Sequence, residues 1–115
     1  MKKIFLTVAV LLFAASSCFA VTDAERKAYD EFMLKLKACT PTSAKLFDGS
    51  HEVFGYEDGA CGYKVVYNNN TTYSCKFPKP VAEMFGYQST KALREGTKSS
   101  FVETMFGSYY CQNNQ

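Results

Sequence analysis

Apolar residues in the segment after position 20 recur at steps of three and four, as they do on one face of a helix. The stripe consists of Tyr29, Phe32, Met33, Leu36 and Cys39. Thr22 and Glu25 have the spacing of a capping box, in which each side chain bonds the backbone N–H of the other residue. The Thr40-Pro41 step disfavours further helix. The pattern therefore predicts an amphipathic helix over 23–39 whose stripe belongs to the core.

Four short β-prone runs follow the predicted helix, separated by residues with turn preferences. The runs cover 43–47, 51–56, 60–67 and 71–77. Asp-Gly, Glu-Asp-Gly and a row of three asparagines lie between them in that order. Turn-forming residues between β-prone runs are typical of successive hairpins. We expect a meander of three to four antiparallel strands packed against the N-terminal helix.

The two runs around the asparagines are expected to form a hairpin with one buried face. Side chains alternate along a strand, and a three-residue loop places odd positions of 60–67 opposite odd positions of 71–77. The odd set is rich in aromatic residues and holds Cys61 and Cys75, whereas the even set is mostly polar, with Val66 as an exception. The two cysteines are therefore predicted to be structural.

The last third of the chain returns to helical signals. Pro80 suits the start of a helix because its missing N–H is not needed there. Glycines at 86, 96 and 107 each follow a short apolar stretch and are predicted to end three short helices. The predicted fold class is α+β: an N-terminal helix packed on a 3–4-stranded antiparallel meander, followed by short C-terminal helices and stapled by disulfides.

The first 20 residues have the layout of a secretory signal peptide of bacterial type. Lys2 and Lys3 precede an uncharged, mostly apolar run at 4–15, and small residues lead up to Ala20. The apolar run is too short to span a bilayer, which takes about 20 residues. We therefore expect cleavage after Ala20, no transmembrane segment in the mature chain, and a single small domain over 21–115.

A second reading of the leader gives a lipid anchor. The sequence Ala-Ser-Ser-Cys at 15–18 loosely resembles a bacterial lipoprotein cleavage box. Cleavage there would leave a lipidated Cys18 as the new N-terminus and would anchor the protein to a membrane.

The charge balance of the mature chain excludes a common class of partner. Lys2 and Lys3 are two of the 13 basic residues, and none of the 11 acidic residues precedes position 21, so 11 basic residues remain against 11 acidic ones. A neutral chain without a basic block has no electrostatic footprint for nucleic acid or an anionic membrane.

Four cysteines remain after the predicted cleavage, and an exported chain meets an oxidising compartment where thiols pair. They are Cys39, Cys61, Cys75 and Cys111. A Cys61–Cys75 bridge would close a loop that the hairpin turn already closes, so it would restrict the unfolded chain little. We favour Cys39–Cys75 with Cys61–Cys111, and Cys39–Cys61 with Cys75–Cys111 is the alternative. Metal and redox sites usually contain two cysteines close together in sequence, and these four have no such spacing, so neither kind of site is indicated.

Few residues in the chain have the chemistry of a catalyst. His51, the one histidine, lies beside a predicted turn, and we expect it to be an exposed strand-edge residue. Glu52, Glu57 and Asp58 are close enough in sequence to form an acid–base pair, although carboxylates in a short loop are common on surfaces. We therefore predict no catalytic, cofactor-binding or metal-binding residues.

Tyrosines are the remaining candidates for a function. Four of them belong to no predicted stripe or buried face: Tyr56, Tyr87, Tyr109 and Tyr110. They either complete the core or anchor a partner, since tyrosine offers a large contact area at low entropic cost. We predict a non-enzymatic binding or inhibitory module, periplasmic or secreted, with a protein or envelope partner of unknown identity. A small carboxylate hydrolase around 52–58 and a lipid-anchored structural protein of the envelope are the alternatives.

Overall fold

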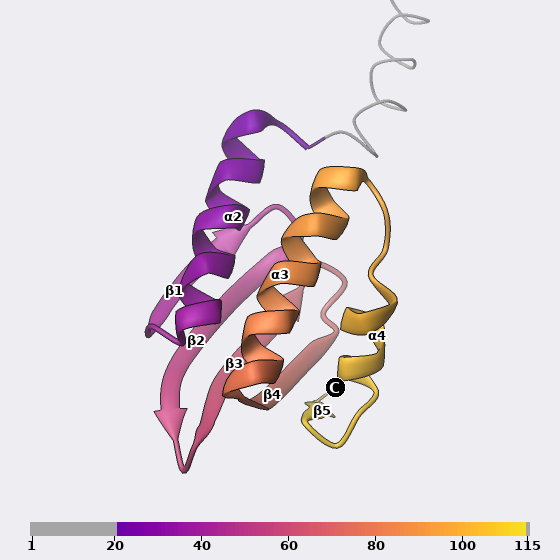
Figure 1. The fold of residues 1–115 in the computed structure, drawn as a ribbon. Helices are drawn as coiled ribbons and strands as arrows, with labels where there is room; N and C mark the ends of the chain where they lie inside the picture. The colour runs from indigo at the N-terminus through magenta and orange to yellow at the C-terminus, as the bar shows by residue number, and fades with distance from the viewer. Residues whose placement is uncertain (1–20, 115) are drawn as a thin grey trace, which may run out of the picture.

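Two long helices cover one face of a five-stranded antiparallel sheet (Figure 1). The computed structural model describes residues 21–114, so the predicted signal peptide, its cleavage site and Cys18 lie outside the described residues. The elements in chain order are α2 (Asp23–Ala38), β1 (Thr42–Leu46), β2 (Gly49–Glu57), β3 (Ala60–Tyr67), β4 (Thr72–Pro78), α3 (Lys79–Glu95), α4 (Ser100–Phe106) and β5 (Cys111–Asn113). No helix within 21–114 is long and apolar enough to cross a membrane.

Helix α2 forms as its sequence predicts, one residue shorter at its C-terminus. The Thr22 N–H donates to the Glu25 carboxylate over 3.0 Å, and the Glu25 N–H donates to the Thr22 hydroxyl over 3.1 Å, so the capping box is confirmed. Cys39 ends the helix in the left-handed conformation, with φ of 52°. The predicted stripe is buried under α2, against the sheet.

The alternation predicted for the central hairpin is also confirmed. Cys61 lies opposite Phe77, and Tyr63 lies opposite Cys75, so odd positions of β3 and β4 share one face. These four side chains are buried beneath the helices. The sheet has one strand more than expected, because the residues after Tyr110 form β5 and pair with β4.

Helix α3 runs through Gly86, so the prediction that Gly86 ends a helix is wrong. Gly86 suits this position because α2 passes too closely for a side chain. A Cβ atom on Gly86 would lie 2.4 Å from Cγ of Lys37 and 3.0 Å from the carbonyl oxygen of Met33. The helix propensity lost at glycine, about 1 kcal/mol, is offset by the close packing of two helices. The predicted stop at Gly96 is confirmed, as is the short helix α4 before Gly107.

The structure joins Cys39 to Cys61 and Cys75 to Cys111. The favoured pairing, Cys39–Cys75 with Cys61–Cys111, is therefore wrong, and the alternative is the one observed. The reason is the unexpected strand β5, whose register places Cys111 directly opposite Cys75 with 4.0 Å between their Cα atoms. Cys39, at the end of α2, lies 5.8 Å from Cys61 between Cα atoms.

Peptide mapping of the unreduced protein should recover fragments that link Cys39 to Cys61 and Cys75 to Cys111. A Cys75→Ala/Cys111→Ala double variant should lose about 3–4 kcal/mol in the free energy of unfolding, because the bond no longer restricts a loop with a sequence separation of 36. Chemical denaturation measures the loss. A fragment that links Cys39 to Cys75 would contradict the assignment.

Replacement of Gly86 by valine should force α2 and α3 apart. We expect the free energy of unfolding to fall by about 1–3 kcal/mol, as is usual when side-chain atoms are added to a packed contact. Lys91→Val is the matched control, because Lys91 is an exposed position of the same helix and carries only the propensity cost, about 0.5 kcal/mol. Urea titrations that give equal losses for both variants would refute the close-contact explanation.

Candidate functional site

The face of the sheet away from the helices carries a groove of about 600 Å³ near the β2–β3 hairpin. Strands β2 to β5 and the segment before β5 supply its walls and floor. The lining residues are Phe54, Gly55, Tyr56, Glu57, Ala60, Gly62, Tyr63, Ser74, Cys75, Lys76, Pro78, Tyr109, Tyr110 and Gln112. We call this feature the aromatic groove.

One wall of the aromatic groove is Phe54, which lies on the solvent side of β2 beside an irregularity in the strand. Val53 pairs with Tyr63 and Gly55 pairs with Gly62, so β2 holds one residue more than β3 at this point. Phe54 is 56% exposed. A Cβ atom on Gly62 would lie 3.2 Å from Cβ of Phe54, so the glycine leaves room for the phenyl ring beside it.

The opposite wall is a pair of tyrosine rings. The ring centroids of Tyr109 and Tyr110 lie 4.3 Å apart, and Tyr109 is the most exposed large apolar side chain in the described part of the chain. The Lys76 N–H donates to the Tyr110 carbonyl over 2.8 Å, and the Tyr110 N–H donates to the Ser108 hydroxyl over 3.2 Å. The Cys75–Cys111 bond fixes the adjoining residue, so the pair is held against β4.

Both disulfides hold strands that form the groove. Cys61 lies between the lining residues Ala60 and Gly62, and Cys111 lies between Tyr110 and Gln112. Covalent links at these points reduce the freedom of the groove walls before any ligand arrives. A site organised in this way loses less entropy on binding.

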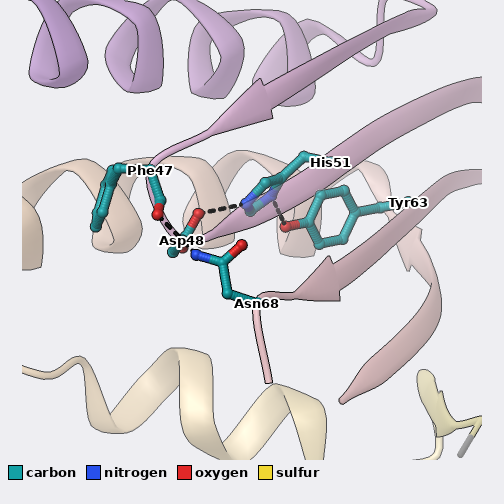
Figure 2. A network of polar contacts seen from close by, with 5 residues as sticks. All are labelled: Phe47, Asp48, His51, Tyr63 and Asn68. Carbon is teal, nitrogen blue, oxygen red and sulfur yellow. Dashed lines mark hydrogen bonds and ion pairs between the residues drawn. The ribbon is translucent and has the colours of Figure 1, made fainter. Parts of the chain in front are cut away.

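His51 is buried, with 3% exposure, so the prediction of an exposed strand-edge histidine is wrong. Figure 2 shows its ring between Asp48 and Tyr63. Nε2 lies 2.8 Å from a carboxylate oxygen of Asp48, and Nδ1 lies 2.6 Å from the Tyr63 hydroxyl. A carboxylate only accepts, so in the neutral ring Nε2 carries the proton and Nδ1 accepts from Tyr63.

The contacts of His51 are structural. Four aromatic rings surround the imidazole at centroid distances of 5.4–6.2 Å, those of Tyr29, Phe32, Tyr63 and Tyr67. The row Asp48–His51–Tyr63 has the atoms of a proton relay, but its Tyr63 end is closed from solvent. A reacting group therefore cannot reach the Tyr63 hydroxyl, whereas the Asp48 carboxylate at the other end of the row is partly exposed.

The same network joins two hairpin turns at the end of the sheet farther from the aromatic groove. The Asn68 side-chain amide donates to the Phe47 carbonyl over 2.9 Å, and the Asn68 N–H donates to the Asp48 carbonyl over 3.0 Å (Figure 2). The β1–β2 turn is thereby tied to the β3–β4 turn, and the buried His51 ties the β1–β2 turn to strand β3.

The predicted carboxylate candidates do not meet in one site. Glu52 lines a separate hollow of about 390 Å³ on the open face, whereas Glu57 lines the aromatic groove. Asp58 is exposed in the β2–β3 turn. Among residues 21–114 no three His, Cys, Asp or Glu side chains gather as metal ligands would.

The four tyrosines singled out in the sequence divide between two faces of the molecule. Tyr56, Tyr109 and Tyr110 line the aromatic groove, whereas Tyr87 lies on α3 in the helical layer. Phe54 and Gly62 were missed by the sequence reasoning. The available signal was Phe54 itself, because Val53 and Phe54 are neighbours on a strand and both cannot face the core.

Comparisons with protein-family models, with curated proteins and with solved structures found no match to this chain.

The buried tyrosines should make the protein less stable in alkali. Burial raises the pKa of Tyr63, and burial followed by the charge of Asp48 raises the pKa of Tyr29 and Tyr67. An unfolded tyrosine ionises near pH 10. Above that pH the unfolded chain releases protons that the folded protein keeps, so the free energy of unfolding falls as pH rises.

Urea midpoints measured from about pH 8 to about pH 11 test this expectation. Tyr63→Phe should reduce the slope and, at neutral pH, should cost about 1–3 kcal/mol, because Nδ1 of His51 loses its partner. Tyr87→Phe, which removes an exposed hydroxyl, is the control and should keep the wild-type slope. Identical slopes in Tyr63→Phe and wild type would show that Tyr63 does not contribute.

Proposed function

We propose that this protein is an exported, non-enzymatic binding module, and that the aromatic groove is the surface that holds its partner. The single observation that carries the proposal is the exposure of Phe54 and Tyr109 on the two walls of one groove. Large apolar side chains gathered on an open face have no stabilising role in the core. Patches of this kind mark interaction sites.

The chemistry of the groove favours binding over catalysis. The lining contains one carboxylate, Glu57, and one ammonium group, Lys76. His51, the one histidine of the chain, is enclosed on the other side of the sheet. Acid–base hydrolysis by carboxylates would need a second carboxylate facing the same bond, and the lining contains none besides Glu57.

The helical layer carries a second candidate binding surface, which is less suited to a partner than the aromatic groove. Tyr87 lies in a hollow of about 510 Å³ between α2 and α3. Tyr87 is the one aromatic residue of that hollow, and charged side chains make up most of its rim: Asp30, Lys37, Lys91, Arg94 and Glu95. Hydrated charges are expensive to cover, and the cores of binding surfaces are depleted of them.

The covalent structure supports an oxidising location for this activity. Two disulfides are compatible with an exported protein, because such bonds persist outside the cytoplasm. Together with the signal peptide predicted at 1–20 they favour the periplasm of a bacterium or the medium around it.

Photo-crosslinking in the producing cells tests the proposal. Benzoylphenylalanine is placed at position 54 or 109, and at 87 as the control. Phe54 and Tyr87 are matched in exposure, at 56% and 51%. Illumination should yield an adduct of one discrete mass from positions 54 and 109 and none from position 87. Mass spectrometry of the adduct then identifies the partner.

Two results would refute the groove as the binding surface. The first is an adduct from position 87 with none from 54 or 109. The second is the absence of any discrete adduct from both groove positions when the protein is present at its natural level and its disulfides are intact.

A further inference from the structure

The aromatic groove has the width of a single extended ligand. Phe54 on β2 and Gln112 on β5 are three strands apart, which is about 14 Å at about 4.8 Å per strand. The side chains of both walls occupy part of that distance. Gly62 has no side chain, and the Phe54 ring lies where one would stand, so the ring leans over β3 into the groove. A ligand one ring or one chain wide fits between the walls.

The charges around the groove balance. Lys76 supplies one positive charge and Glu57 one negative charge, and the other lining side chains are uncharged at neutral pH. A strongly charged ligand would meet one attractive and one repulsive group, with no net gain. The complementary occupant is therefore neutral.

The floor offers few free backbone groups to a ligand. Strand β3 and the part of β4 that forms the floor have neighbours on both sides, so their N–H and C=O groups already bond within the sheet, whereas residues 54–57 of β2 lie beyond the pairing with β1, which ends at Val53. A peptide laid across this floor cannot add as a further strand. Its own buried N–H and C=O groups would lack partners, which is costly for a polypeptide.

A sugar ring matches the groove better than a peptide does. The C–H groups on the flat face of a pyranose carry partial positive charge and suit the negative face of an aromatic ring. Its hydroxyls project from the rim of the ring. Ser74, Lys76 and Gln112 supply donors and acceptors for them between the two walls.

We infer that the aromatic groove binds a neutral glycan chain, with one sugar stacked on the Tyr109–Tyr110 pair and a neighbouring sugar against the Phe54 ring. The inference rests on the proposed function, for which it names the ligand class. Recognition depends on two aromatic platforms separated by a floor of small and polar residues.

Nuclear magnetic resonance titration of the oxidised protein tests the inference. The probes are a cello-oligosaccharide and a chito-oligosaccharide, which are neutral, an oligogalacturonate, which is anionic, and a blocked neutral peptide of Gly, Pro and Tyr. At least one neutral sugar should shift the amides of Gly62, Ser74 and Gln112. Its affinity should stay within about twofold when NaCl is raised from about 50 mM to about 500 mM, because salt screens only charge–charge attraction.

Matched variants separate the groove from the rest of the surface. Phe54→Ala and Tyr109→Ala should each weaken the sugar about tenfold, as expected when an exposed stacking platform is lost. Tyr87→Ala should leave the affinity unchanged. Wild-type amide spectra outside the groove establish that each variant is folded.

Three results would overturn the glycan inference: shifts caused by the peptide alone, shifts caused by the oligogalacturonate alone, or no shift from either neutral sugar. Crosslinks from positions 54 and 109 to a polypeptide, combined with no sugar binding, would remove the glycan and leave the proposed function in place. No crosslink and no sugar binding would remove both.

Discussion

A five-stranded sheet has two faces, and the two long helices of this chain cover one of them. The alternation of side chains along β3 and β4 sends Cys61, Tyr63, Cys75 and Phe77 to the covered face, where they pack beneath α2 and α3. Gly86 lets the two helices approach closely enough to form a continuous layer. That layer buries the apolar side chains on one face of the sheet. The opposite face is not covered by the helices, and it carries the aromatic groove.

The two ends of the sheet are held by different kinds of bond. At one end His51 joins Asp48 to Tyr63, and Asn68 ties the neighbouring turns together, all through hydrogen bonds. Nearer the aromatic groove, two disulfides hold β3 to the end of α2 and β4 to β5. A domain of this size has a modest core, so such links supply a large share of its rigidity. The disulfides therefore hold the floor strand β3 and the tyrosine wall beside β5 in place.

Local sequence rules were sufficient where neighbours along the chain decide the conformation. The capping box of Thr22 and Glu25, the apolar stripe of α2 and the shared face of β3 and β4 each depend on spacing within one element or one hairpin. The same rules failed at Gly86, where the deciding contact comes from Met33 and Lys37 on another helix. Sequence rules predict that a helix ends at Gly86, whereas in the folded protein this residue allows two helices to pack closely.

The chain by itself determined the α+β class, the meander, the buried odd face and the commitment of four cysteines to crosslinks. Only the tertiary structure decided which cysteines pair, because the partner of Cys75 lies on a strand that forms by adding to an existing sheet edge. It also decided that His51 is buried, since its acceptor and donor come from a turn and from a neighbouring strand. The aromatic groove has the same origin: Phe54 and Tyr109 are far apart in sequence, and the order of strands in the sheet makes them two walls of one site.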